Sequence, residues 1–249
     1  MYLAWHVALV TGASRGIGAA IARGLAREGA DVAVGYERDW DAASRVVSRI
    51  ERGGRRAVAV GGDLRNPAMV ERICDETEAS LGPVDVLVSN AGIAPRQQLE
   101  EISVEGWDEV MEVNLRPAFL LGKRLAPGMR ERGWVRIVVS SVAAFTGGLV
   151  GLHYTASKAA LIGLAHSLGA SLAPHGVTVN AVAPALIEGG GTLPRGGQDD
   201  EEAHEKLAAR VPVGRLGRPE EVAQAVCSLV ANPFLTSQTI SVDGGMHPR

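Results

Sequence analysis

The sequence predicts an α/β fold with a doubly wound parallel sheet, and two features of the 249-residue chain carry this prediction. Valine-rich apolar runs recur along the chain, and continuous apolar runs are typical of strands that are covered on both faces. Segments with helical spacing lie between them, and strand alternating with helix indicates right-handed crossover units. The expected strands are HVALVT (6–11), DVAVGY (31–36), RAVAVGG (56–62), VDVLVSN (84–90), VRIVVSS (135–141), VTVNAVAP (177–184) and TISVDGG (239–245).

Helices are expected between these strands from their apolar stripes and their start signals. The segments Gly16–Glu28 and Asp39–Glu51 each place apolar residues on one helical face. Asn66 is a suitable N-cap, and Pro67 fits the first position of the following helix. No proline- or serine-rich linker and no repeat divides the chain, so residues 1–249 are expected to form one domain. A segment that is glycine-rich, then acidic, then helical follows the sixth strand, and an insertion of this kind is typical of a lid, here at about 187–213, or of a disordered loop.

Composition and charge exclude several classes of protein. With 46% hydrophobic and 21% charged residues, the chain can bury a sizeable core and is neither disordered nor fibrous. Its net charge of -3 gives no basic footprint for nucleic acid or an anionic membrane surface. Cys74 and Cys227 lie far apart and outside any zinc or disulfide spacing, and the N-terminal run is too short to span a bilayer. We therefore expect a cytoplasmic protein without bound metal.

The turn after the first strand is rich in glycine and runs straight into a helix. It reads TGASRGIG, Thr11–Gly18, with glycines in the spacing G-x-x-x-G-x-G. Glycine allows a phosphate to approach the backbone closely, and the helix N-terminus offers free amide donors to a pyrophosphate. The same glycines would also suit a simple tight turn. Its position between a strand and a helix favours a dinucleotide site.

Further motifs follow in order: SNAG (89–92), Asn114 in VNL, Ser141 in SSVAA, Tyr154 and Lys158 in YTASK, VNAVAP (179–184) and VDGG (242–245). Together with the T-G-x-x-x-G-x-G turn, this set resembles the short-chain dehydrogenase/reductase family, in pattern most of all its 3-oxoacyl-[acyl-carrier-protein] reductases. The resemblance extends from Val7 to Gly245. It implies a single-domain Rossmann fold with a seven-stranded parallel sheet, assembled into a homotetramer or homodimer.

Tyr154 and Lys158 are spaced for acid/base chemistry. Positions four apart lie on one helix face, and an ammonium beside a phenol favours the phenolate, so Lys158 should lower the pKa of Tyr154. The resemblance implies that Tyr154 is the general acid for ketone reduction and that Lys158 also bonds the nicotinamide ribose. It further implies that Asn114 kinks its helix and holds a water that links Lys158 to solvent. Ser141, at a strand end, would bond the substrate oxygen. Without the resemblance, Tyr154 and Lys158 could be an amphipathic pair on a helix surface. Asn114 could satisfy local backbone groups, and Ser141 could be an ordinary hydroxyl at a strand end.

The cofactor implied is a nicotinamide dinucleotide. An acidic residue at the end of the second strand selects NAD, whereas arginine there accommodates the 2′-phosphate of NADP. Tyr36 occupies the selector position, and Arg15 and Arg38 offer planar donors, so NADP(H) is favoured over NAD(H), although Glu37 argues the other way. By resemblance, the cofactor contacts are Gly12, Ser14, Arg15, Gly16, Ile17, Gly18, Arg38, Asp63, Leu64, Asn90, Ala91, Gly92, Tyr154, Lys158, Pro184 and Ile187.

The substrate is less well defined by the sequence than the reaction. An apolar wall from Phe145, Leu149 and Leu152 would suit an acyl, cyclic or polyketide-like ketone, free or as an acyl thioester. The leading expectation is NADPH-dependent reduction of such a ketone to a secondary alcohol. A dehydrogenase of a secondary alcohol, such as a sugar or steroid, is the alternative. A non-catalytic cofactor sensor is a third, but such proteins characteristically lose the tyrosine or lysine. The apolar helices expected at Val104–Arg124 and Leu152–Leu172 are compatible with a subunit interface.

Overall fold

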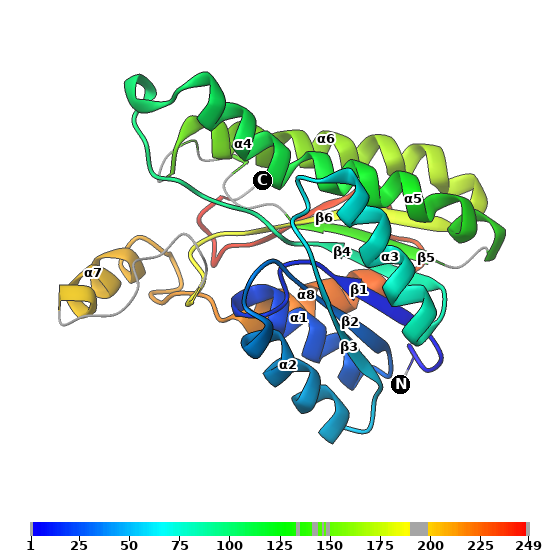
Figure 1. Ribbon diagram of the computed structural model, residues 1–249. Coiled ribbons are helices and arrows are strands. Elements are labelled where there is room, and N and C mark those ends of the chain that lie inside the picture. The colour runs from blue at the N-terminus through cyan, green and yellow to red at the C-terminus, as the bar shows by residue number, and fades with distance from the viewer. Residues whose placement is uncertain are drawn as a thin grey trace.

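The computed structural model describes residues 2–132, 135–140, 144–145, 147, 150–189 and 199–247. Within these ranges, seven parallel strands form one sheet in the order β3-β2-β1-β4-β5-β6-β7. Each lies within a run predicted from its valine content, so the predicted doubly wound α/β fold is confirmed (Figure 1). The strands are β1 Val7–Val10, β2 Asp31–Tyr36, β3 Ala57–Gly61, β4 Val84–Ser89, β5 Val135–Ser140, β6 Val177–Pro184 and β7 Thr239–Val242.

Helices cover both faces of the sheet, as the continuous apolar strands require (Figure 1). One core cluster packs α1, α2 and α8 against one face, and a second packs α3, α5 and α6 against the other. The α-helices are α1 Gly16–Arg27, α2 Trp40–Arg52, α3 Pro67–Leu81, α4 Val104–Asn114, α5 Arg116–Arg132, α6 Leu152–Leu172, α7 Asp199–Ala208 and α8 Pro219–Ala231, and the 3₁₀ turns are η1 Leu99–Glu101 and η2 Ala173–His175. None of the helices in the described ranges is long and apolar enough to cross a bilayer.

The strand order reverses between β1 and β4, and this reversal determines where a ligand can bind. The chain leaves β1 toward β2 on one side and later leaves β4 toward β5 on the other. In open α/β sheets, the crevice opens outside the carboxyl ends of the strands at such a reversal. The glycine turn after β1 and the SNAG motif at the end of β4 both lie at this edge.

The helix starts differ in one respect that matters for the site. Asp39 caps α2 by accepting from the Ala42 N–H, and Asn66 caps α3 by accepting from the Ala68 N–H, as predicted for Asn66. Helix α1, in contrast, has no side-chain cap and no acidic residue in its first turn. Its start follows the glycine turn, so the free donors of α1 face the crevice edge.

The helix expected over Val104–Arg124 is in fact two helices, which corrects that prediction. Helix α4 ends at Asn114, and α5 begins at Arg116. Pro117 has no N–H to donate to the carbonyl of Val113 and its ring crowds that carbonyl, which favours a break at this point. The break places Asn114 at a helix end, where its side chain is buried beneath the site.

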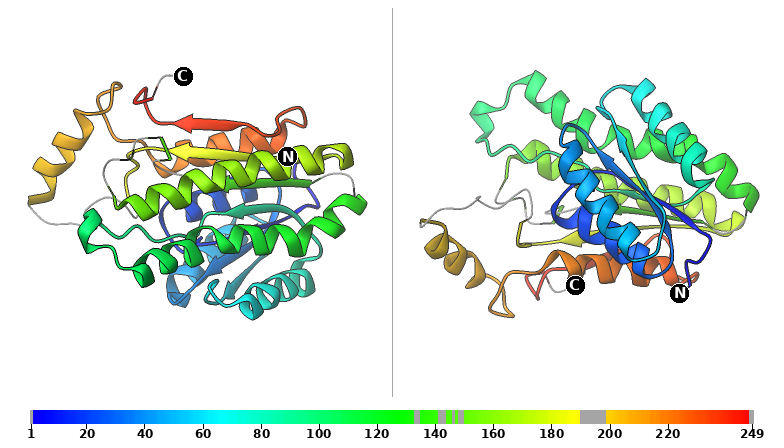
Figure 2. Two further views of the ribbon diagram at one scale, coloured as in Figure 1. Left: turned by 90° about the horizontal axis from the view of Figure 1, so that it is seen from above. Right: turned by 60° about the horizontal axis from the view of Figure 1, so that its bottom comes forward.

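The predicted lid is described in part. Helix α7 lies within 187–213 and stands away from the sheet in both views of Figure 2. Residues 190–198 of the predicted lid lie outside the described residues. That this segment closes over a substrate, and that residues 1–249 act as one domain, both stay predictions.

Candidate active site

The turn between β1 and α1 needs glycine at three positions. Gly12 and Gly16 have left-handed backbone conformations, with φ of 61° and 54°. Gly18 has an ordinary conformation, but a Cβ there would collide with the carbonyl oxygen of Gly12 and lie 2.5 Å from the Asn90 amide nitrogen. The absence of these side chains leaves a backbone cradle at the start of α1.

This cradle suits a diphosphate. The first N–H groups of a helix have no intrahelical partners and carry a partial positive charge, and the side chain of Arg15, at the N-cap of α1, makes no capping bond to them. Phosphate oxygens would accept from these donors. The residues present therefore fit the dinucleotide predicted from the sequence, with Ser14, Arg15 and Ile17 on the same turn; Arg15 is exposed and its side chain is accessible to an anion.

A hydrogen-bond network ties the glycine turn to the end of β4. Thr11 Oγ1 accepts from the N–H groups of Asn90 and Ala91 at 3.0 and 3.1 Å. The Asn90 side-chain amide donates back to the carbonyl oxygens of Thr11 and Gly12, also at 3.0 and 3.1 Å. Asn90 thus holds the turn in shape, and Thr11 is a site residue that the sequence analysis missed.

Asn114 joins the loop after β4 to helix α6. Its Oδ1 accepts from Ile93 N–H at 2.8 Å, and its Nδ2 donates to Ile93 O and Ser157 Oγ, both at 3.0 Å. Ser157 in turn donates to the carbonyl oxygen of Tyr154 at 2.7 Å. Asn114 therefore acts here through the main chain of the loop and the start of α6. The water predicted for it stays a prediction. Ser157 was also missed, although it stands within the YTASK motif.

Tyr154 and Lys158 lie together in the first turns of α6, as their spacing predicts. Both are buried, and Lys158 Nζ lies over the Tyr154 ring, 5.7 Å from its centroid. A Cβ on Gly92 would lie 3.0 Å from Asn114 Oδ1 and 3.3 Å from Lys158 Nζ. Because Gly92 follows β4, the phenol and the ammonium lie beside the edge of the sheet that carries the glycine turn.

The electrostatics of this pair correct one prediction. We expected Lys158 to lower the pKa of Tyr154, but burial raises the pKa of the phenol above its ordinary value. Burial also lowers the pKa of Lys158 to about 8. Desolvation disfavours the charged form of each group, and in this chain it outweighs their mutual attraction. Tyr154 therefore keeps its proton at neutral pH, which is the state that a general acid needs.

The segment after β6 packs beside the glycine turn. Pro184 ends β6, and Ile187, buried, forms a β-bridge with Gly217. The carbonyl oxygen of Gly189 would lie 3.0 Å from a Cβ on Gly16. The predicted nicotinamide neighbours are thus at the same edge as the phosphate cradle. Ser141, predicted to bond the substrate oxygen, lies outside the described residues.

Comparison with known proteins decides the family. The model of a family described as enoyl-(acyl carrier protein) reductase matches residues 12–247. The chain belongs to the short-chain dehydrogenase/reductase family. It is an NAD(P)-dependent oxidoreductase, because its relatives are named dehydrogenases and reductases and its fold matches theirs.

Three relatives indicate the range of this family around the chain. L-rhamnose 1-dehydrogenase (NAD(P)(+)) of Sphingomonas sp. SKA58 is 37% identical and covers 96% of this chain and 95% of that protein. 3-Oxoacyl-[acyl-carrier-protein] reductase FabG of Escherichia coli K12 is 38% identical, covering 97% of each. A crystal structure of blue fluorescent protein from a metagenomic library, in complex with NADPH, superposes with a TM-score of 0.90 at 34% identity and covers 100% of both chains.

In this short-chain dehydrogenase/reductase, arginines surround the predicted adenine end of the site. Arg65 donates to both carboxylate oxygens of Asp63, and this contact holds the pKa of Asp63 below its usual range. Arg65 also bonds Glu109 of α4 at 3.2 Å. Leu64 between them is half-buried and packs against the core. The carboxylate of Asp63 is thus oriented by Arg65, and its contact with adenine stays a prediction.

The end of β2 carries no carboxylate at the selector position. The ring of Tyr36 lies across Gly61, where a Cβ would be 2.6 Å from the Tyr36 Cζ. Arg38 is exposed and donates to the neighbouring Glu37 carboxylate at 3.0 Å. Such an exposed pair is weak, so the Arg38 guanidinium is free to turn toward an added phosphate.

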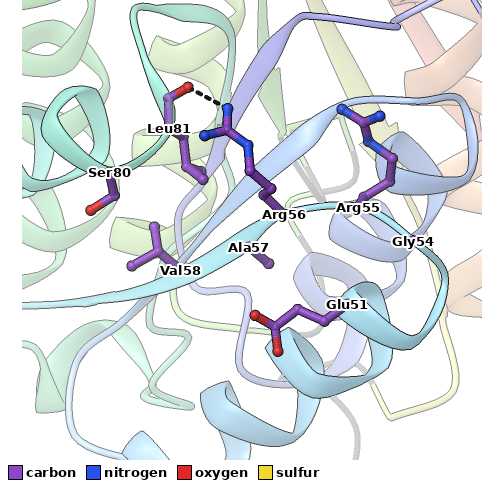
Figure 3. Close-up of a pocket in the computed structure, with 8 residues that line it drawn as sticks. All are labelled: Glu51, Gly54, Arg55, Arg56, Ala57, Val58, Ser80 and Leu81. Carbon is purple, nitrogen blue, oxygen red and sulfur yellow. Dashed lines mark hydrogen bonds between the residues drawn. The ribbon is translucent and has the colours of Figure 1, made fainter.

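A polar depression lies at the opposite edge of the sheet from the glycine turn, where β3 begins (Figure 3). Arg55 and Arg56 both pair with the buried carboxylate of Asp31, and Arg56 also donates to Leu81 O at 2.8 Å. These contacts neutralise Asp31 and join β2, β3 and the end of α3. The depression is thus a structural ion-pair cluster at the amino ends of the strands, away from Tyr154.

Proposed function

We propose that the enzyme reduces a 3-oxoacyl or polyketide-like ketone to a secondary alcohol, with NADPH as the hydride donor. The observation that carries the proposal is the buried phenol of Tyr154 with Lys158 Nζ over its ring, beside the glycine cradle. A ketone oxygen placed at the phenol would receive its proton as the carbonyl carbon is reduced.

Each residue has a separate role in this proposal. Tyr154 donates its O–H proton to the substrate oxygen, and the Lys158 ammonium stabilises the phenolate that remains. Ser141 bonds the same substrate oxygen, and Asn114 holds Ile93 and Ser157 in place around the pair. The bound nicotinamide supplies the hydride, while the protein provides orientation and electrostatics.

Oxidation of a secondary alcohol, such as that of a sugar, is the second candidate. The similarity to L-rhamnose 1-dehydrogenase, at 37% identity over nearly the whole chain, favours it to about the same degree as the 3-oxoacyl reductase favours the first. The same Tyr154 would then act as the base. The two candidates differ in the substrate that the crevice accepts.

The test is a direct comparison of the two substrate classes. The enzyme should oxidise NADPH in the presence of an acetoacetyl thioester. Its kcat/KM for the thioester should exceed its kcat/KM for L-rhamnose with NADP⁺ by at least about tenfold. Nicotinamide absorbance at neutral pH is the readout. A faster reaction with L-rhamnose would replace the first candidate by the second, and no reaction with any ketone or alcohol would contradict both.

NADPH preference has its own test, because two neighbouring residues should act in opposite directions. Arg38→Ala should raise KM for NADPH about tenfold and leave KM for NADH within about twofold, since only NADPH carries the 2′-phosphate that Arg38 would bind. Glu37→Gln should strengthen the preference for NADPH, because it releases Arg38. Equal changes for both cofactors in Arg38→Ala would contradict the assignment.

The proposal includes an assembly and a compartment. Val104 of α4, Phe119 of α5 and Leu152 of α6 are exposed apolar side chains, which supports a homotetramer or homodimer formed through these helices. Both cysteines are free, which supports a reducing cytoplasm. A monomeric mass in solution would contradict the assembly.

A further inference from the structure

His153 precedes Tyr154 and is completely buried. Its Nε2 lies 3.1 Å from Gln97 Oε1, and its ring lies across Gly151, where a Cβ would collide with it. Because the Gln97 oxygen can only accept, the imidazole carries its proton on Nε2. The other ring nitrogen, Nδ1, is buried and has no hydrogen-bond partner among the described residues.

Gln97 continues this contact into the loop that leaves β4. Its Nε2 donates to Glu101 O at 3.3 Å, and Gly151 N–H donates to Pro95 O at 3.2 Å. Residues 95–101, here called the 95–101 loop, follow Ile93 in the chain and end with the turn η1. The loop is thus attached to the start of α6 at two points, while Ile93 just before it is held by Asn114. Of these attachments, the one through His153 is made by side chains alone.

The described residues satisfy only one of the two imidazole nitrogens of His153. Burying a polar atom without a partner costs about 1–3 kcal/mol, and an apolar side chain of similar size would avoid that cost. What His153 adds is a directional bond to Gln97, next to the residue that holds the reacting proton. The bond therefore serves the shape of the site better than the stability of the fold.

We propose that His153 is a positioning residue that holds the 95–101 loop against the start of α6 as one wall of the substrate crevice. This wall determines the affinity for the ketone. His153 acts on Tyr154 only through the main chain that joins the two residues. This inference rests on the proposed function, because it assigns the loop to the substrate of that reaction. Gly151 N–H donates to Pro95 O at 3.2 Å, and Gly151 O accepts from Tyr154 N–H at 3.1 Å, so the loop and Tyr154 share one anchor.

The first test uses His153→Leu, Gln97→Leu and the double variant. Each single variant should raise KM for an acetoacetyl thioester about five- to tenfold, the effect of one hydrogen bond, with kcat within about twofold. KM for NADPH should stay unchanged. The double variant should be no worse than either single one, because both remove the same bond. His153→Gln, whose side-chain N–H can replace the imidazole donor, should restore most of the affinity.

A second measurement separates this inference from the proposed function. Hydrogen exchange of the backbone amides at 96–101 should be faster in His153→Leu and Gln97→Leu than in the wild type, and near the wild-type rate in His153→Gln. This readout needs no turnover, so it decides the positioning role even if the enzyme reduces no ketone. Unchanged exchange, or a loss of kcat at constant KM, would overturn the proposal. A fall in melting temperature of both Leu variants together with a rise in NADPH KM would also overturn it, because it would show a general structural role.

Discussion

Tyr154→Phe should lower kcat for ketone reduction by about 10²–10⁴-fold. Phenylalanine keeps the buried ring and its contact with Lys158 but has no proton to donate. Stopped-flow or steady-state absorbance of NADPH measures the change. Protection of the variant against heat by NADPH should match the wild type, because the substitution leaves the glycine cradle untouched.

The chain offers a matched control for this substitution. Tyr2 is partly exposed and its hydroxyl donates to the Cys227 carbonyl oxygen, which belongs to α8 and not to the site. Tyr2→Phe removes the same oxygen and should leave kcat within about twofold. If Tyr154→Phe retained full activity while Tyr2→Phe also did, the assignment of Tyr154 as the proton donor would be abandoned.

Lys158→Met should abolish measurable turnover and at the same time make the protein more stable at pH 7. The ammonium is buried, and no carboxylate pairs with it in the described part of the chain. With the pKa lowered to about 8 from 10.5, the charge costs the folded state up to about 3 kcal/mol at neutral pH. Removing that cost should raise the melting temperature by about 5 °C. Calorimetry and activity on the same sample measure both effects.

The pH dependence of this stability difference has a definite sign. Between about pH 8 and 10.5 the unfolded chain binds the Lys158 proton and the folded chain does not, so wild-type stability rises with pH across this window. Below about pH 8 both states hold the proton, and the full cost of burial remains. The advantage of Lys158→Met should therefore be largest below pH 8 and shrink toward pH 10.5. An advantage that does not change with pH would show that the gain comes from packing.

Local patterns were sufficient for the framework of this protein. The strands, the uncapped start of α1 after Thr11–Gly18, and the cap at Asn66 were predictable because each depends on neighbours in the chain. The spacing of Tyr154 and Lys158 was predictable for the same reason, since one helical turn joins them. The break at Leu115 was also within reach, because Pro117 stands two residues later.

Contacts between distant segments were not predictable in this way. The bonds of Asn114 to Ile93 and Ser157, and of Gln97 to His153, join residues between 21 and 56 positions apart. Nothing in the spacing of these residues indicates that they meet, because their distances depend on how α4 and α6 pack beside the end of β4. The complete burial of His153 is likewise a result of this packing.

The sequence by itself determined the family and the α/β order of the elements and predicted the acid/base pair, since these reside in short motifs and in periodicity. Only the tertiary structure decided how that pair is charged. Sequence spacing indicates that Lys158 lies near Tyr154, and proximity alone would lower the phenol's pKa. Burial of both side chains raises the pKa of Tyr154 and lowers that of Lys158, because desolvation disfavours each charge. The depth at which a helix face is buried depends on what packs on it, and that is a property of the whole fold.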